Sequence, residues 1–130
     1  MSAALRRIAS LAVILAAAAC SGDDGKTVAM SDGRVFEPEV LTVEAGDTVR
    51  FVGESEDAHT VTAYDEGVPE GASYFASGDF AGEDEARDDV AGGLLAPGDS
   101  FEVVFDLPGT YRYFCVPHED SGMTGRIVVE

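Results

Sequence analysis

Four side chains that can bind a metal ion stand out in this sequence, and three of them share one short segment. Cys115, His118 and Met123 lie close together near the end of the chain, whereas His59 lies far upstream. A thiolate, two imidazoles and a weakly bound thioether are the ligands of blue-copper electron-transfer sites. The chain contains only 2 His residues, and this set uses both. The residue types and their order therefore predict one type 1 copper ion that cycles between Cu(I) and Cu(II).

Other metals and ordinary structural roles are the alternatives for these residues. Thiolate and thioether donors prefer copper over harder ions. A structural zinc site usually has four Cys or His ligands, and this set provides fewer. Taken one at a time, Cys115 could be a buried thiol, Met123 a core residue, and His59 and His118 surface residues. All four together, in this order and in an exported β-rich chain, favour the copper site.

The residues between these candidate ligands suit a loop that folds back over one ion. Cys115 ends a predicted strand, so the chain can turn directly after it. Pro117 stiffens the loop and removes a backbone donor beside the ligands. Gly122 permits the turn that returns Met123 toward the site. Because His59 begins a distant predicted strand, a bound metal would join two separate parts of the fold.

The rest of the chain reads as short strands separated by turns. Polar and apolar residues alternate in several runs, as in half-buried strands, and Gly, Pro and Asp mark turns between them. This pattern predicts an all-β, Greek-key antiparallel β-sandwich of about seven to eight strands. Residues 64–93 break the pattern and are predicted to form an acidic loop or a short helix around Gly82 to Val90. The predicted strands cover residues 27–30, 35–36, 40–43, 48–52, 59–63, 100–105, 110–115 and 124–129.

The first residues have the features of an export signal. Arg6 and Arg7 precede an apolar run that ends in small residues before Cys20, and this run is too short for a typical membrane span. We therefore expect a signal peptide over residues 1–19, a flexible tether over 20–25 and one domain over 26–130. Cys20 resembles a lipoprotein acceptor and is the predicted lipidation site, with ordinary cleavage and a spare Cys as the alternative. The Arg pair leaves both Sec and twin-arginine export open.

The chain is strongly acidic. Its formal net charge is −17, and removal of Arg6 and Arg7 with the leader would leave six of its 8 Lys and Arg residues against 25 Asp and Glu. Such a charge excludes nucleic acids and anionic lipid surfaces as partners. Self-repulsion also costs stability in dilute buffer, and that cost mostly disappears at about 1 M salt, where the Debye length is roughly 3 Å. A halophilic source explains the charge most simply, and a basic redox partner is the competing explanation.

Most of the chain after the tether resembles the plastocyanin branch of the cupredoxins. The most similar subgroup is the halocyanins, which are membrane-associated blue copper proteins of halophilic archaea. The similarity is carried by the early strands, by the segment around the first His and by a Cys-x2-His-x4-Met loop, which lie at residues 35–51, 57–61 and 109–123. It implies the copper ligands, equatorial His59, Cys115 and His118 and axial Met123. It also implies that Phe36, in any case a core aromatic residue, packs below the metal.

Two positions depart from the plastocyanin pattern. Plastocyanins have Asn after the first ligand His, where it helps to connect the two ligand loops, and Thr60 takes that place here. The Thr60 hydroxyl can serve the same purpose. Plastocyanins also carry an exposed Tyr immediately before the ligand Cys. Phe114 replaces it here, which puts a lateral electron route past a phenol in doubt.

The predicted function is the transfer of single electrons between membrane-associated redox partner proteins. We expect a monomer on the outer face of the cytoplasmic membrane. An exported protein for copper storage, delivery or resistance is the alternative, although such proteins usually display Met-rich or His-rich tracts and this chain has 3 Met. A metal-free interaction domain would have no use for the paired ligands. Catalysis is not expected, because copper oxidases and nitrite reductases need further His clusters and a binuclear centre needs two Cys in the loop.

Overall fold

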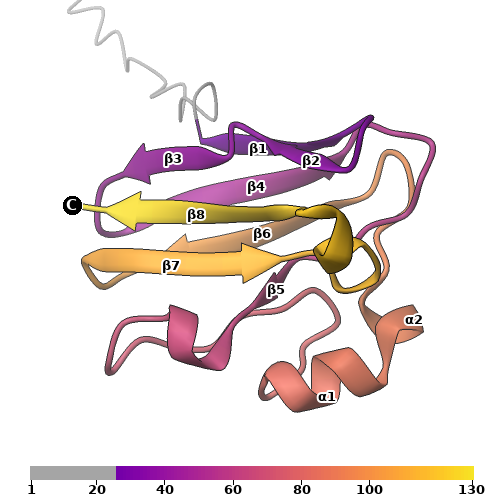
Figure 1. The fold of residues 1–130 in the computed structure, drawn as a ribbon. Coiled ribbons are helices and arrows are strands. Elements are labelled where there is room, and N and C mark those ends of the chain that lie inside the picture. Colours follow the sequence, from indigo (N-terminus) through magenta and orange to yellow (C-terminus); the bar gives the residue numbers. More distant parts are fainter. Residues whose placement is uncertain (1–25) are drawn as a thin grey trace, which may run out of the picture.

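A computed structural model describes residues 26–130, which form two four-stranded β-sheets packed face to face (Figure 1). The predicted signal peptide, the tether and Cys20 lie outside the described residues. The first sheet has the order β2-β1-β4-β6, and the second has the order β3-β8-β7-β5. The all-β sandwich predicted from the sequence is confirmed. Strands β1 to β8 span Thr27–Ser31, Val35–Glu37, Val40–Val43, Asp47–Gly53, Thr62–Ala63, Ser100–Phe105, Gly109–Phe114 and Thr124–Val129.

Both sheets are mixed rather than purely antiparallel. β1 runs parallel to β4, with Thr27 opposite Arg50, and β3 runs parallel to β8, with Val40 opposite Arg126. The other pairs are antiparallel. Parallel neighbours need a crossover connection. Here both connections pass through the opposite sheet, through β3 between β1 and β4 and through β4 and β6 between β3 and β8. Residues alternate between the two faces in both kinds of pair, so the sequence pattern alone does not separate them.

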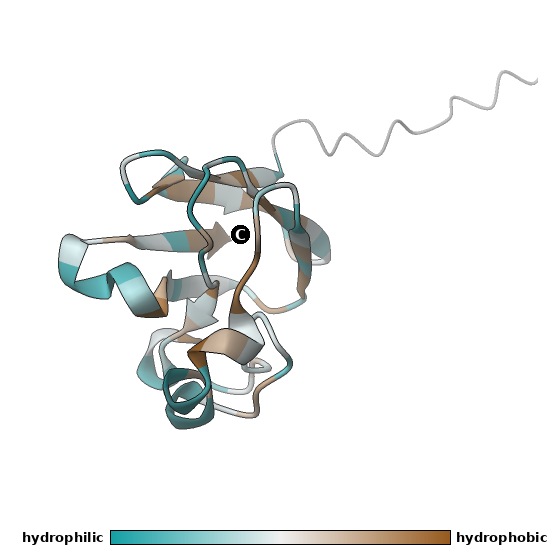
Figure 2. Cartoon of the chain, turned by 90° about the vertical axis from the view of Figure 1, so that its right-hand side faces the viewer, coloured by the Kyte–Doolittle hydropathy of each residue, from teal (hydrophilic) through white to brown (hydrophobic). Residues whose placement is uncertain are grey.

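The connection between the edge strands β5 and β6 carries the helices. A 3-10 turn, η1, spans Asp65–Gly67, and it is followed by α1 at Glu83–Asp88 and α2 at Val90–Gly93. Helix α1 is strongly hydrophilic (Figure 2), but its Ala86 is only 2% exposed and packs against the body of the protein. The short helix predicted within the acidic insertion is therefore present. Among residues 26–130, no helix is long and apolar enough to cross a membrane.

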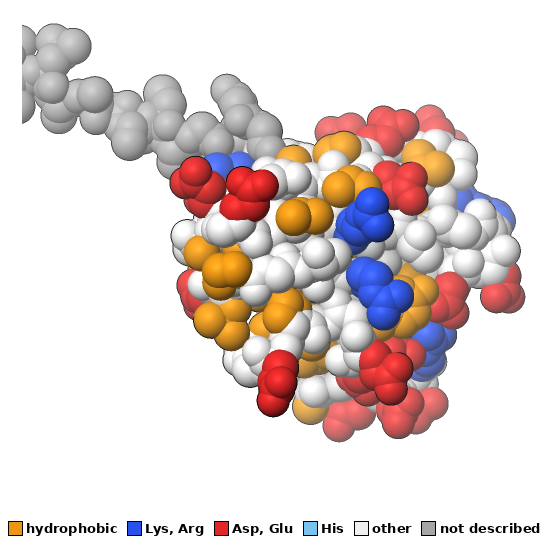
Figure 3. Space-filling model, turned by 60° about the vertical axis from the view of Figure 1, so that its left-hand side comes forward, with side chains coloured by type: hydrophobic (Ala, Val, Ile, Leu, Met, Phe, Trp, Pro, Cys, Tyr) orange, Lys and Arg blue, Asp and Glu red, His pale blue; other side chains and the backbone are white. Residues whose placement is uncertain are grey.

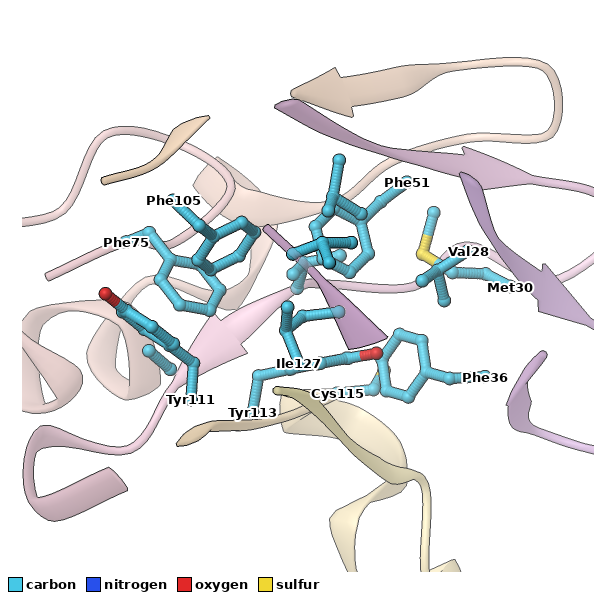
Figure 4. Packing of buried hydrophobic residues seen from close by; sticks show 14 of the residues in the cluster. Val28, Met30, Phe36, Phe51, Phe75, Phe105, Tyr111, Tyr113, Cys115 and Ile127 are labelled. Carbon is cyan, nitrogen blue, oxygen red and sulfur yellow. The ribbon is translucent and has the colours of Figure 1, made fainter. Parts of the chain in front are cut away.

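The hydrophobic core lies between the two sheets (Figure 4). Val28, Phe51 and Ile127 are fully buried there. Tyr113 reaches across the core toward Phe36, with ring centroids 4.8 Å apart and an interplanar angle of 75°. A second edge-to-face contact joins Tyr113 to Phe51 at 5.3 Å. Aromatic pairs in this geometry stabilise a core beyond the area that they bury, so Tyr113 is a central packing residue.

The two ends of the sandwich hold different groups. At one end Lys26 forms an ion pair with Asp47 at 2.9 Å, and the N–H of Ala45 donates to the carbonyl of Glu130. The other end holds the β1–β2 turn and the segments that precede β5 and follow β7 (Figure 1). The candidate ligands predicted from the sequence gather at this second end.

Candidate metal centre

The donor atoms of His59, Cys115 and His118 converge at one end of the sandwich. The Nδ1 atoms of the two His lie 3.1 Å apart, and Sγ of Cys115 lies 3.4 Å from Nδ1 of His118 and 3.8 Å from Nδ1 of His59. The ligand atoms of the three residues all lie within 4.8 Å of one another. Two imidazole nitrogens and a thiol sulfur at this spacing form a donor set that suits copper. The residues present therefore fit a single copper ion.

The segment from Cys115 to Met123 folds into a compact loop that positions two of these donors. Cys115 directly follows β7, and the 3-10 helix η2 (Val116–Ser121) carries His118. The N–H of Cys115 donates to the carbonyl of Met123 at 3.0 Å, and the N–H of Met123 donates to the carbonyl of His118 at 3.2 Å. Gly122 ends η2 with a φ of 84°, a left-handed conformation that favours glycine. These bonds return the fully buried Met123 to the end of β7.

His59 is held by a hydrogen bond that the sequence analysis did not predict. Its Nε2 lies 2.7 Å from Oγ of Ser55, and the Ser55 hydroxyl donates to the carbonyl of Asp57 at 3.1 Å. Because the single hydroxyl proton of Ser55 goes to Asp57, Nε2 of His59 carries a proton and donates it to Ser55. This tautomer leaves the Nδ1 lone pair available for a metal. No sequence signal marks Ser55, since its contact depends on how residues 54–58 fold.

The hydroxyl of Thr60 connects the two ligand segments, as the comparison with plastocyanins suggested. The N–H of Val116, next to Cys115, donates to Oγ1 of Thr60 at 2.8 Å. The backbone N–H of Thr60 lies 3.4 Å from Sγ of Cys115 and donates to it. Thr62 in β5 donates a further hydrogen bond to Thr60 at 3.1 Å. The segment after His59 and the segment after β7 are thus joined by direct bonds beside the sulfur.

Burial sets the protonation of the three donors. Desolvation lowers the pKa of His59, and the nearby His118 lowers it further. Desolvation and the charge of Arg34 lower the pKa of His118. Desolvation raises the pKa of the Cys115 thiol, although hydrogen bonds from the Thr60 and His118 backbones act in the opposite direction. Neutral imidazoles are the metal-binding form, whereas a buried thiolate needs a neighbouring positive charge, which a metal ion provides.

The other residues predicted for the site occupy different parts of it. Phe36 is 2% exposed and belongs to the hydrophobic cluster that also contains Cys115 and Met123. Pro117 lies exposed in the first turn of η2. His59 is fully buried, whereas His118 is partly exposed. His118 is therefore the imidazole of this pair that a partner could reach.

Ser55→Ala is expected to lower the affinity for copper by about 10- to 100-fold, the usual effect of removing a hydrogen bond to a metal-bound His. The variant loses the acceptor that orients the His59 ring. Titration of the protein against a copper chelator measures the loss. Ser77→Ala is the matched control, because Ser77 is also buried and its hydroxyl bonds Val61 and Gly93 instead. Equal losses of affinity in the two variants would contradict the role of Ser55.

Comparison with known proteins supports the same metal. The family described as copper binding proteins, plastocyanin/azurin family, matches residues 24–130. A plastocyanin from Scenedesmus fuscus is 38% identical over 105 residues, which cover 81% of this chain and 96% of the relative. A chloroplastic plastocyanin from Tetradesmus obliquus is 33% identical over 134 residues, covering 99% of this chain and 85% of the relative.

A solved structure shares the fold. A purple cupredoxin from Nitrosopumilus maritimus superimposes with a TM-score of 0.59 at 22% identity, covering 80% of this chain and 98% of that chain. The family match identifies the metal as copper, and His59, Cys115 and His118 are positioned as a single copper site, typical of type 1 copper. The chain belongs to the plastocyanin/azurin family of copper-binding proteins.

Proposed function

We propose that this protein is a type 1 blue copper electron carrier that shuttles single electrons between membrane-associated redox partner proteins and has no catalytic activity of its own. The observation that carries the proposal is the convergence of His59, Cys115 and His118 from two distant segments of a β-sandwich. Bound copper supplies the exchange of one electron between Cu(I) and Cu(II). The family relatives named above as plastocyanins support this assignment.

The chain contributes fixed donors and a dry environment around the sulfur. Cys115 is fully buried, and the Thr60 N–H bond to Sγ, at 3.4 Å, partly balances a negative charge there. Ser55 fixes the His59 ring through its Nε2. These bonds hold the three donors together before any metal binds. The donors would therefore have to move little when a bound copper ion gains or loses an electron. The partly exposed His118 provides the contact through which a partner would exchange electrons.

Copper loading of the protein tests this function. One equivalent of Cu(II) is expected to turn the metal-free protein intensely blue, and ascorbate is expected to bleach the colour. Voltammetry should then show one reversible one-electron couple. A copper storage or delivery protein would instead take up copper without the blue colour or bind several ions per chain. Either of those results would overturn the proposal.

We further propose that Met123 is the axial ligand, on the basis of its full burial and the backbone bonds that return it to Cys115. Met123→Gln is expected to keep the blue absorption and to lower the reduction potential, because an amide oxygen stabilises Cu(II) more than a thioether does. Voltammetry of the copper-loaded variants measures the change. Met30→Leu, at another fully buried Met, is the control and should leave the potential unchanged. An unchanged potential in Met123→Gln would remove Met123 from the axial position.

Surface charge supports a basic partner. Acidic side chains are spread over the face shown in Figure 3, and Asp120 lies exposed two residues after His118. Glu119, in contrast, forms an ion pair with Arg87 at 2.9 Å. Its charge is therefore partly neutralised and attracts a basic partner less than an unpaired carboxylate beside His118 would. Complementary charge accelerates association mainly at low ionic strength. In concentrated salt, apolar contact around His118 would decide docking.

We also propose an exported, monomeric, membrane-attached protein of a halophilic source, similar to the halocyanins. The support comes from the signal-like residues 1–19, from Cys20 directly after them, and from the net charge of −17. A diacylglyceryl group on Cys20 would anchor the protein to the outer face of the cytoplasmic membrane. Mass spectrometry of the mature N-terminus tests this, because a lipid on Cys20 and an unmodified Cys20 have different masses.

A further inference from the structure

The helical insertion contacts the ligand loop through one arginine. Nη1 of Arg87, near the end of α1, donates to Oε1 of Glu119 at 2.9 Å, and Nη2 donates to Oε2 at 3.0 Å, which makes a bidentate ion pair. Nε of Arg87 donates to Glu83, one helical turn earlier, at 2.8 Å. Glu119 directly follows His118 in η2. One guanidinium therefore joins the insertion to the residue beside a candidate copper ligand.

Aromatic contacts complete this connection. The hydroxyl of Tyr64 donates to Oε2 of Glu119 at 2.8 Å, and the Tyr64 ring stacks on Phe114 with centroids 4.3 Å apart and planes 26° from parallel. The guanidinium of Arg87 lies 4.3 Å from the centroid of the same Phe114 ring. Phe114 is fully buried and immediately precedes Cys115. We call Tyr64, Arg87, Phe114 and Glu119 the loop clamp.

Helix α1, which carries Arg87, is joined to η1 by two hydrogen bonds. The N–H of Asp65 donates to the Glu83 carboxylate at 3.0 Å, and the N–H of Glu83 donates to the Asp65 carboxylate at 2.9 Å. Isolated surface ion pairs contribute little to stability. The pair of Arg87 and Glu119 is bidentate and belongs to a network, so it can hold α1 and η2 in a fixed relative position.

The two candidate imidazole ligands are held in different ways. Nε2 of His59 has Ser55 as its partner, whereas Nε2 of His118 has no hydrogen-bond partner within residues 26–130. The position of the His118 ring therefore depends on the backbone of η2. That backbone is fixed on one side by the bonds of Met123 and Gly122 and on the other side by Glu119.

We propose that Arg87 is a positioning residue for the copper site, acting through Glu119 to hold η2 and with it the ring of His118. The inference rests on the proposed copper function and extends it to the acidic insertion, to which the sequence analysis gave no role. Because the insertion holds η2 in place, the ring of the partly exposed His118 can occupy fewer positions. In electron carriers, fixed ligands limit the rearrangement that accompanies each transfer.

Arg87→Ala is expected to alter the visible and paramagnetic-resonance spectra of the copper-loaded protein and to lower copper affinity by about 10-fold, as for other residues that orient ligands from outside. Glu119→Gln removes the other half of the ion pair and should alter the spectra in the same direction. Arg87→Lys keeps the charge but cannot form the bidentate pair, so it should restore only part of the affinity. Chelator competition and the two spectra measure these changes.

The two variants change the charge in opposite directions, which distinguishes a positioning role of Arg87 from a purely electrostatic effect on the copper site. Arg87→Ala removes a positive charge and Glu119→Gln removes a negative one, so Coulomb effects alone shift the reduction potential in opposite directions and leave the spectra alone. Loosening of η2 changes the spectra in the same way in both. The metal-free proteins give an independent readout, because the amide protons of Gly122 and Met123 should exchange faster in both variants. Arg50→Ala is the control, since Arg50 is exposed in β4 of the other sheet and forms no ion pair with Glu119 in the described part of the chain.

The proposal is overturned if Arg87→Ala and Glu119→Gln both keep the wild-type spectra and copper affinity. It is equally overturned if they shift only the potential, in opposite directions, or if Arg50→Ala produces the same spectral change. Should Arg87→Ala fail to fold, the near-isosteric Glu119→Gln decides the question by the same measurements. A wild-type protein that stays colourless with copper would instead contradict the proposed function, so the two failures are distinguishable.

Discussion

Cys115→Ser is expected to abolish the blue absorption of the copper-loaded protein and to lower its Cu(II) affinity by more than about 100-fold. Loss of a residue that merely orients a ligand costs about 10- to 100-fold, and here the ligand itself is lost. A serine hydroxyl is a harder donor than a thiolate and remains protonated at neutral pH. His59 and His118 keep their places, so weak binding without colour should remain. Absorption spectroscopy and chelator competition measure both effects.

Cys20→Ser is the matched control for this variant. Cys20 is the other Cys of the chain, and we place it outside the copper site. Its replacement should leave the colour and the affinity unchanged. If Cys115→Ser keeps the blue colour, or if Cys20→Ser loses it, then His59, Cys115 and His118 do not form the copper site.

Gly125→Ala is expected to destabilise the folded protein by about 1–3 kcal/mol, the usual cost of overfilling a packed core. Gly125 in β8 lies directly opposite Tyr113 in β7. A Cβ atom at this position would lie 2.5 Å from Oη and 2.6 Å from Cζ of Tyr113. Tyr113 is fully buried and packs edge-to-face on Phe36 and Phe51, so it cannot retreat without displacing them. Urea unfolding of the metal-free protein measures the change in free energy.

Tyr113→Phe tests whether this contact causes the loss. The Tyr113 hydroxyl has no hydrogen-bond partner among the residues that the structure describes, and an unsatisfied buried group costs about 1–3 kcal/mol. Its removal should therefore be neutral or stabilising. Gly125→Ala should cost less in the Tyr113→Phe background, because the nearest clashing atom is gone.

Gly82→Ala is the control for the glycine effect. A Cβ there would lie 3.4 Å from Oδ1 of Asp65, an ordinary contact, and the backbone is extended. Its stability should stay within about 1 kcal/mol of wild type. Strict additivity of Gly125→Ala and Tyr113→Phe would show that the destabilisation has another origin.

Local patterning predicted the strands well where neighbouring strands supply the backbone hydrogen bonds. β3, β6 and β8 have the predicted bounds, and buried and exposed residues largely alternate along β6 and β8. The strand predicted over residues 59–63 is wrong in length, since only Thr62–Ala63 forms β5. The N–H groups before it donate elsewhere: His59 to Leu95, Thr60 to the sulfur of Cys115, and Val61 to Ser77. The backbone N–H groups of residues 59–61 therefore hold the region around the candidate ligand His59 and do not extend β5.

The three donors were predictable because their chemistry is rare in this chain, which has 2 His and 2 Cys. The residues that support them were not. Ser55 bonds His59 only because a loop folds back, and Arg87 reaches Glu119 across 32 positions of sequence. Carboxylates surround Arg87 in the sequence, and an acidic run by itself indicates only a solvated surface. The parallel strand pairs were also hidden, since they depend on a crossover between sheets rather than on any local pattern.

The described chain starts at the opposite end of the sandwich from the copper donors. Lys26 is paired with Asp47 at that end, whereas His118 lies at the far side in η2 (Figure 1). If the protein is fixed through residues before 26, on a bilayer or on an electrode, the exposed imidazole faces away from the support. Immobilisation through the start of the chain is therefore the geometry in which a freely diffusing partner keeps full access to the metal.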